Sequence, residues 1–259
     1  MAIPKIIHYC WFGGNPLPEL ALKCIESWKK FCPDYKIIEW NEKNFDINYN
    51  VYVKEAYETK KWAFVSDVAR LYALVTVGGV YMDTDVELIK PIDCFLEYEA
   101  FSGFESVGRM PTGIMASEKD SSFMIKLLKD YDGERFLRED GSYDNTSNVI
   151  RITKACMEAG FSKKNVKQTY DGFTLFPSEY FCPMSYETRQ LELTDNTYAI
   201  HHFNGSWLTD TERTTIIIRK HLKRFMPHMM AAHTAKFLAY VKVEGLKKAV
   251  GETFKFFKK

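Results

Sequence analysis

The chain has 259 residues, of which 46% are apolar and 15% aromatic, so it can bury a full core and is not a disordered chain. No run of about 18 apolar residues occurs, and the N-terminus lacks the pattern of a signal peptide, so we expect neither a transmembrane helix nor a leader. Six scattered cysteines without a CxxC pair favour buried free thiols in a cytoplasmic protein over a zinc site.

The net charge of +1 conceals an uneven distribution of charge along the chain. Residues 219–259 contain 11 Lys and Arg against 2 Glu, whereas the rest of the chain contains 24 basic against 32 acidic residues. An acidic body with a basic tail indicates a partner for the tail. We therefore predict a catalytic domain over 1–207 and a basic, amphipathic helical tail over 208–259.

The predicted elements alternate between strands and helices in the first half of the chain. A strand over 3–12 precedes an amphipathic helix over 20–32 and a strand over 35–41. The segment 51–79 starts irregular, becomes helical over 63–75 and ends at Gly78-Gly79, before a strand over 80–85. Further strands are expected over 100–106, 172–183 and 196–203, and helices over 121–131 and 147–160. This alternation predicts an α/β fold with a parallel sheet and crossover helices.

The sequence "GGVYMDTDVEL" places two carboxylates, Asp83 and Asp85, at the end of a short apolar strand. If the strand continues through them, both point to the same face, and two like charges there need a positive partner. Ligands of open α/β sheets bind outside the carboxyl ends of the strands. Paired carboxylates suit Mg²⁺ or Mn²⁺ carrying a nucleotide diphosphate, although such pairs also occur as solvated acidic turns.

The preceding helix adds Ser66, Asp67 and Arg70 near one face. Asp67 and Arg70 are three residues apart, so their side chains can meet. The pair is either an internal ion pair or a pair that binds hydroxyl and phosphate groups, and the sequence leaves both possibilities open.

Four further polar or aromatic residues lie at predicted strand ends. The stretch "YAIHHFNGSW" contains His201 and His202, which point to opposite faces of a strand, so at most one of them faces the carboxylates. His8 and Trp11 lie at the end of the first strand, where a tryptophan either stacks on a nucleotide base or packs in the core.

Taken in order, "IPKIIHYCWFGG", "AFVSDVARLYAL…GGVYMDTDVEL" and "YAIHHFNGSW" resemble the family 32 glycosyltransferases, which share a sugar-binding region with a DXD motif. The layout is also similar to the catalytic domain of the large clostridial glucosylating toxins. The resemblance covers nearly all of the chain up to Trp207. It implies a Rossmann-like GT-A fold with a mixed, mostly parallel sheet. It also implies retaining transfer of a sugar from a nucleotide donor with a divalent ion, usually Mn²⁺ and otherwise Mg²⁺.

The resemblance also implies roles for individual residues. Asp67, Arg70, Asp83 and Asp85 are the implied catalytic residues, and Asp83, Asp85 and His201 are the implied metal ligands, with His202 as the alternative histidine. The implied nucleotide-sugar contacts are His8, Trp11, Ser66, Asp67, Arg70, Tyr81, Asp83, Ser206 and Trp207. Many relatives have an Asn-Ala pair where this chain has Pro111 and Thr112, and Asp144 or Asn145 is a candidate for the group beneath the anomeric carbon.

These features together predict a hexosyltransferase that uses a nucleotide sugar, most simply a UDP-sugar, and a glycan acceptor, as in capsular or surface-polysaccharide synthesis. The expected location is the cytoplasm, with the tail at the anionic inner face of the cell membrane and the acceptor linked to a lipid. Nucleic acid is not an expected partner because the acidic body would repel it. The alternatives are an inactive nucleotide-sugar-binding module and a metal-dependent nucleotidyltransferase.

Overall fold

The structure of the protein is a computed structural model that describes residues 2–110, 113–186, 188–205 and 210–257. The chain forms two compact units, Met1–Phe203 and Asn204–Lys259. The predicted domain boundary after residue 207 falls in the segment 206–209, which lies outside the described residues.

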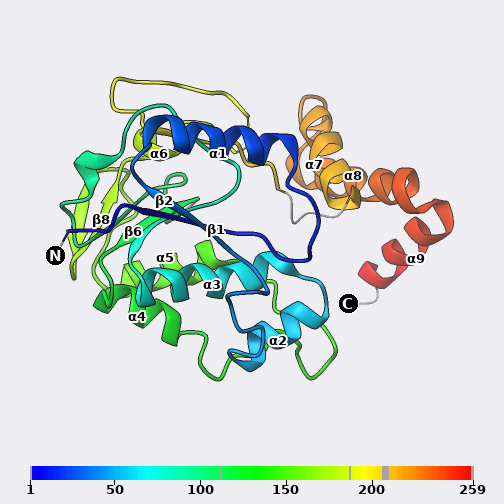
Figure 1. Cartoon of the computed structure of the whole chain (residues 1–259). Helices are drawn as coiled ribbons and strands as arrows, with labels where there is room; N and C mark the ends of the chain where they lie inside the picture. The colour runs from blue at the N-terminus through cyan, green and yellow to red at the C-terminus, as the bar shows by residue number, and fades with distance from the viewer. Residues whose placement is uncertain (1, 111–112, 187, 206–209, 258–259) are drawn as a thin grey trace. The chain divides into compact units, whose positions relative to one another are not determined.

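The first unit is built on a central sheet (Figure 1). This sheet has seven strands in the spatial order β2-β1-β3-β6-β5-β8-β7. Its strands are β1 (Ile6–Cys10), β2 (Lys36–Trp40), β3 (Gly79–Met82), β5 (Ala100–Gly103), β6 (Ile114–Ser117), β7 (Gln168–Tyr170) and β8 (Phe173–Phe176). A second, two-stranded sheet pairs β4 (Val86–Leu88) with β9 (Ala199–His201).

Most strands of the large sheet point in one direction. Strand β1 pairs in parallel with β2 and β3, and β5 pairs in parallel with β8, whereas β6 joins β3 to β5 through two antiparallel pairings. Consequently β1, β2, β3, β5 and β8 share one direction, and β6 and β7 run the opposite way. The predicted α/β fold with a mixed, mostly parallel sheet is confirmed, and the carboxyl ends of β1, β3 and β5 lie at one edge.

Two hydrophobic cores cover the opposite faces of this sheet because side chains alternate along each strand. On β3, Val80 and Met82 belong to one core, and Tyr81 belongs to the other. Helices α1 and α6 cover the first face, and α3, α4 and α5 cover the second (Figure 1). The helices of this unit are α1 (Glu19–Phe31), α2 (Val51–Glu58), α3 (Trp62–Thr76), α4 (Ser122–Lys129), α5 (Asn148–Glu158) and α6 (Ser178–Phe181), with a 3₁₀ turn η1 (Asp93–Phe95).

The turn that delivers β3 to the site requires glycine. Gly78 and Gly79 have positive φ angles of +73° and +115°. A Cβ on Gly79 would lie 2.7 Å from the carbonyl oxygen of Ile6 on the neighbouring strand β1. The two glycines therefore end α3 and let β3 approach β1 closely enough to pair.

Four local predictions differ from the structure. The segment expected to be irregular after residue 51 is helix α2, which Asn50 caps by accepting a hydrogen bond from the Val53 amide at 2.9 Å. Strands β4, β6 and β7 were not predicted, and part of the strand expected over 172–183 is instead the helix α6. The strand expected over 80–85 ends at Met82, so the two carboxylates lie beyond it.

The second unit consists of α7 (Asp210–Leu222), α8 (His228–Glu244) and α9 (Leu246–Phe257). Helices α7 and α8 pack together, and Thr211 at the start of α7 donates a hydrogen bond of 2.7 Å to Glu244 at the end of α8, so the two helices run antiparallel. Large apolar side chains remain exposed, including Phe225 at 84% and Met229 at 73%. Among the described helices, none has both the length and the apolar character that a membrane crossing requires.

Candidate functional site

Asp83 and Asp85 lie in a tight turn at the carboxyl end of β3. The Asp83 carbonyl accepts a hydrogen bond from the Val86 amide at 3.0 Å, and the Asp83 amide donates to the Gly113 carbonyl at 2.7 Å. The expectation that strand alternation brings the two carboxylates to one face is therefore wrong, because a turn between β3 and β4 brings them together instead. The site does lie at the carboxyl edge of the parallel strands, as predicted.

The positive partner of Asp83 is Arg70 of helix α3. The guanidinium lies 3.2 Å from Asp83 Oδ1 and 3.2 Å from Asp67 Oδ1, and its side chain is only 8% exposed. It also lies over the ring of Tyr81, 4.5 Å from the centroid, and the Tyr81 hydroxyl donates to Asp83 Oδ1 at 2.8 Å. Both contacts use Oδ1, which leaves the other oxygen of Asp83 for a ligand.

Burial and paired charges shift the pKa values of this cluster. Burial acts to lower the pKa of Arg70, but the carboxylates of Asp83 and Asp67 reverse this and raise it, so Arg70 stays charged. Burial raises the pKa of Asp67 to about 6, although Arg70 and the backbone amide of Asn148 at the start of α5 oppose the rise. Asp67 therefore titrates close to neutral pH, which is a property of functional carboxylates.

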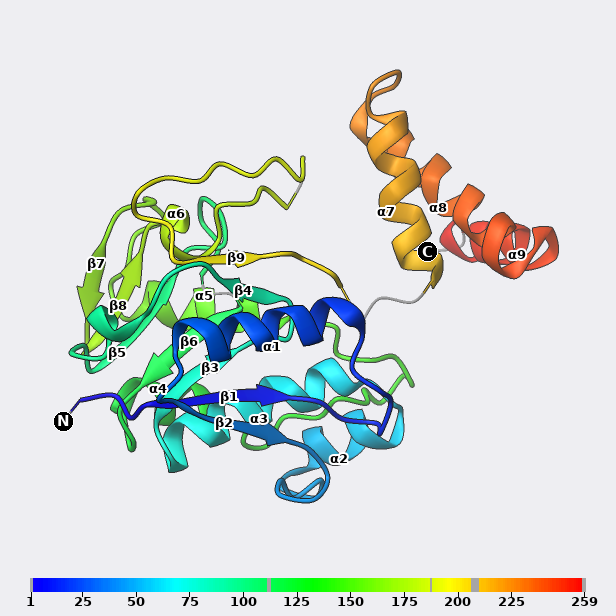
Figure 2. The same ribbon diagram turned by 45° about the horizontal axis from the view of Figure 1, so that its top comes forward.

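The positive partner of Asp85 is His201, which comes from the small sheet. Strand β4 pairs with β9 (Figure 2), so Val86 lies opposite His201. His201 Nε2 is 3.3 Å from Asp85 Oδ1. His202 points to the other face, as strand alternation predicts, and its Nε2 is 2.8 Å from Glu87 Oε2. Burial alone would lower the pKa of His201, but Asp85 raises it well above its usual value.

Asp83, Asp85 and His201 form a donor set that fits a divalent ion. One ligand atom from each lies within 4.8 Å of the other two. Two carboxylates and one imidazole suit Mn²⁺, and Mg²⁺ when phosphate oxygens complete the shell. Gly113 makes room for this arrangement, since a Cβ there would lie 2.6 Å from Val86 and 3.3 Å from the His201 ring.

His8 has a structural position. It is fully buried, its Nε2 donates to the Gly78 carbonyl at 2.7 Å, and its Nδ1 accepts from the Trp40 indole at 3.0 Å. Burial lowers the pKa of His8, and the two bonds fix the neutral tautomer with the proton on Nε2. Neither ring nitrogen remains for a nucleotide sugar, so the structure gives His8 a role in joining β1 to β2 and to the turn before β3.

The other residues predicted to contact the nucleotide sugar differ in their burial and in their hydrogen bonds. Trp11 is half-buried, and its indole donates to the Asn15 carbonyl at 2.6 Å. Ser66 is half-buried in α3 and donates back to the Trp62 carbonyl at 3.0 Å. Ser206 and Trp207 lie outside the described residues, as do Pro111 and Thr112.

An open pocket of about 570 Å³ lies in the loops beyond Trp11. It is lined by Gly13, Gly14, Asn15, Glu42, Tyr57, Lys60 and Trp62. Glu42 orders the glycine loop by accepting from the Gly13 amide at 2.7 Å. The pocket therefore continues the carboxyl edge past the end of β1.

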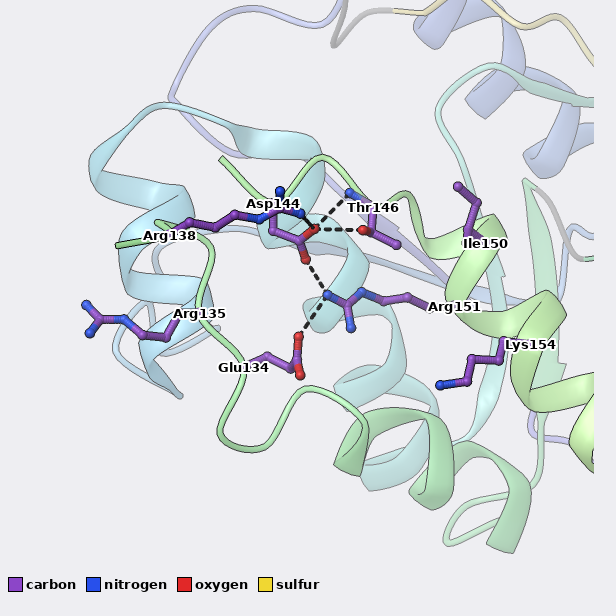
Figure 3. Close-up of a pocket in the computed structure, with 8 residues that line it drawn as sticks. All are labelled: Glu134, Arg135, Arg138, Asp144, Thr146, Ile150, Arg151 and Lys154. Carbon is purple, nitrogen blue, oxygen red and sulfur yellow. Dashed lines mark hydrogen bonds and ion pairs between the residues drawn. The ribbon is translucent and has the colours of Figure 1, made fainter. Parts of the chain in front are cut away.

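A second pocket, of about 340 Å³, lies between α5 and the loop that precedes it (Figure 3). Within it Asp144 pairs with Arg138 at 3.1 Å and with Arg151, and accepts from the Thr146 hydroxyl at 2.7 Å. Burial would raise the pKa of Asp144, but the bonds from Thr146 and Arg151 lower it overall. Asp144 is therefore part of an ion-pair network that holds the loop against α5.

Glu105 is an acidic residue of this region that the sequence analysis missed. It follows the carboxyl end of β5 as Asp83 follows that of β3, and its side chain is 10% exposed. The signal that could have found it is an acidic residue just after an apolar strand in "AFSGFES", the same pattern that drew attention to Asp83.

Comparison with known proteins identifies the region that carries most of these residues. Residues 18–102 match the family model described as "Glycosyltransferase sugar-binding region containing DXD motif". This part of the chain is similar to the sugar-binding region of glycosyltransferases. Its segment includes Asp67, Arg70, Tyr81, Asp83 and Asp85, so the predicted resemblance to the DXD glycosyltransferases is confirmed.

Two curated relatives share the sugar-binding region. Inositol phosphoceramide mannosyltransferase 3 of Schizosaccharomyces pombe is 27% identical over 139 residues, which cover 49% of this chain and 37% of that protein. Mannosyl phosphorylinositol ceramide synthase SUR1 of Saccharomyces cerevisiae is 30% identical over 135 residues, covering 49% and 34%. The matches thus span about a third of the length of these relatives.

Among solved structures, the PaToxG glycosyltransferase is similar with 18% sequence identity and a TM-score of 0.44. The alignment covers 61% of this chain and 69% of that chain.

Proposed function

We propose that this protein is a metal-dependent GT-A type glycosyltransferase that moves a hexosyl group from a nucleotide sugar to an acceptor hydroxyl. The observation that carries the proposal is the convergence of Asp83, Asp85 and His201 beside the buried Asp67–Arg70 pair. Hard-metal ligands and a fixed cation at the carboxyl edge of an α/β sheet suit a sugar diphosphate. The family match of the segment supports the same chemistry.

The proposed reaction breaks the bond between the anomeric carbon and the diphosphate and forms a bond to the acceptor oxygen. Asp83, Asp85 and His201 would hold a divalent ion, which would supply Lewis-acid stabilisation of the leaving diphosphate. Arg70 holds a positive charge where negative charge develops, and Asp67 accepts hydrogen bonds from sugar hydroxyls. The acceptor hydroxyl gives its proton to the leaving phosphate oxygen, on the face from which the diphosphate departs, so the configuration is retained.

The donor is proposed to be a UDP-sugar with the base stacked on Trp11. Trp11 lies at the carboxyl end of β1, next to the pocket that begins at Gly13. Trp11 is a half-buried tryptophan at this edge, and stacking of a base on an aromatic ring tolerates different bases.

The acceptor is proposed to be a glycan hydroxyl on a lipid carrier, as in surface-polysaccharide assembly. The relatives described above are named for mannosyl transfer to inositol phosphoceramide, which makes a membrane-lipid acceptor reasonable for this chain as well.

The basic second unit is proposed to bring the enzyme to an anionic membrane surface at the cytoplasmic face. Exposed Phe225, Met229, Met230 and Leu246 are interspersed with lysines and arginines, a composition suited to helices in the interface. Each basic residue contributes about 1 kcal/mol near an anionic surface. Cosedimentation with anionic vesicles at low salt should be lost in a chain that ends near Ala235, and equal binding of both proteins would refute the attachment.

The experiment that tests the function is a screen of nucleotide sugars with Mn²⁺, scored by release of free nucleoside diphosphate. Metal-dependent release with one donor supports the proposed activity. Donor binding without release would support the alternative, an inactive binding module. Release of pyrophosphate from a nucleoside triphosphate would instead identify a nucleotidyltransferase, which also uses paired carboxylates.

A further inference from the structure

Glu105 is a nearly buried carboxylate at the edge of the site, and the proposed mechanism does not use it. It leaves β5 at the same edge at which Asp83 leaves β3, because β3 and β5 share one direction. Only β6 separates these two strands in the sheet. Its side chain is 10% exposed, less than the 16% of Asp85 and the 26% of Asp83.

The protein provides little compensation for the charge of Glu105. Across the described part of the chain, no side chain or amide donates a hydrogen bond to its carboxylate. Its one ion-pair partner there is Arg109, with 4.0 Å between Oε1 and NH1, and the Arg109 side chain is 62% exposed. A pair so long and so exposed stabilises little, whereas a carboxylate removed from water needs strong donors.

The charged groups that act on Glu105 are Arg109 and two members of the metal cluster, His201 and Asp83. Burial raises the pKa of Glu105, His201 and Arg109 oppose the rise, and Asp83 adds to it. The pKa of the buried Cys182 thiol is raised by burial, lowered by His201 and raised by Glu105. Glu105 lies outside the group of three described residues whose ligand atoms are within 4.8 Å of one another, so it is not among the residues expected to bind an ion directly.

We propose that Glu105 is a positioning residue of the metal site that accepts a hydrogen bond from a water ligand of the divalent ion. The inference rests on the proposed metal-dependent function. Mn²⁺ and Mg²⁺ retain water ligands when a few side chains and a diphosphate provide the other oxygens. Such water carries the strong donors that Glu105 lacks, and partners of this kind change metal affinity by 10–100-fold.

The test compares Mn²⁺ binding by the full chain and by Glu105→Gln, using the electron paramagnetic resonance signal of free Mn²⁺. Glutamine keeps the shape and removes the charge, so we expect Mn²⁺ affinity to fall by about 10–100-fold. Glu105→Asp keeps the charge and should recover part of the affinity. Unchanged affinity in Glu105→Gln would overturn the inference.

Thermal unfolding in EDTA separates positioning from a merely structural role. A buried carboxylate without donors costs free energy in the metal-free protein, so Glu105→Gln should leave the melting temperature unchanged or raise it. If Glu105 instead served an ion pair with Arg109, the same variant would lower it, and that result would contradict the proposal.

Two matched controls complete the design. Arg109→Ala removes the one ion-pair partner and should leave Mn²⁺ affinity unchanged, as should Glu97→Gln, which changes an exposed glutamate outside the site. A loss in Arg109→Ala equal to that in Glu105→Gln would overturn the inference. Absence of Mn²⁺ binding by the unmodified protein would overturn the proposed metal site itself, so the two failures are distinguishable.

Discussion

The two carboxylates of the turn after β3 are held in different ways. Asp83 is fixed from within the domain core, by the buried guanidinium of Arg70 and the hydroxyl of the fully buried Tyr81. Asp85 instead meets His201, which belongs to a separate two-stranded sheet formed with a segment far along the chain. One side of the site is therefore part of the hydrophobic core, and the other depends on a distant strand being in register.

This difference indicates that the Asp83 side and the Asp85 side contribute differently to the stability of the fold and to activity. Arg70 lies between Asp67 and Asp83, so the Asp83 side contains a network of buried charges whose members need one another. On the Asp85 side, the carboxylate and the His201 imidazole are 3.3 Å apart, and a bound cation would contact both. Damage to the first side should affect stability and activity together, whereas damage to the second should affect activity more than stability.

The largest effect is expected from Arg70→Ala, which breaks the Asp83 side. It leaves the buried Asp67 and the half-buried Asp83 without their cation and should lower the free energy of unfolding by about 3–5 kcal/mol, measured by urea denaturation. Donor turnover should be lost as well. Lys29→Ala is the matched control, because Lys29 and Glu26 form an exposed pair with the same three-residue spacing, and it should change stability little. Equal stability of the two variants would show that the buried network is not structural.

Asp85→Ala should break the Asp85 side without breaking the fold. Loss of a direct metal ligand removes several kcal/mol of transition-state stabilisation, about a thousandfold in rate, and Mn²⁺-dependent binding of nucleoside diphosphate should disappear. The near-ultraviolet circular dichroism and melting temperature should stay close to those of the unmodified protein. Full activity of this variant in the presence of a chelator would refute the metal role.

Trp11→Ala tests whether affinity for the nucleotide sugar also depends on a residue outside both the Asp83 side and the Asp85 side. Removing a stacking surface should weaken binding of the donor by about 1–3 kcal/mol, measured by isothermal titration with the nucleoside diphosphate and Mn²⁺. The melting temperature indicates whether the ring also supports the fold, since part of Trp11 packs against the core. Unchanged affinity would assign Trp11 to the core alone.

Hydrophobic periodicity and turn residues predicted much of the fold. The site residues could be predicted from the sequence where they lie close together along the chain. The helical spacing of α3, the stop at Gly78-Gly79 and the three-residue spacing of Asp67 and Arg70 are local signals. Strand β6 was missed because it is defined by long-range antiparallel pairing with β3 and β5. Glu105 was missed although it follows an apolar strand, because its place at the same edge as Asp83 depends on the order of β3, β6 and β5 in the sheet.

The smallest effect is expected from substituting the two histidines, His201 and His202. This pair of variants tests most directly which residue completes the Asp85 side. His201 points to Asp85, and His202 points to Glu87, so only His201 can ligate an ion held by the two aspartates. His201→Ala should raise the Mn²⁺ concentration needed for half-maximal activity about tenfold, because one of three protein ligands is lost while both carboxylates remain. His202→Ala removes a contact outside the cluster and should raise it less. A larger effect of His202→Ala would show that β9 pairs with β4 in the other register during catalysis, because a shift of one residue exchanges the faces to which the two rings point.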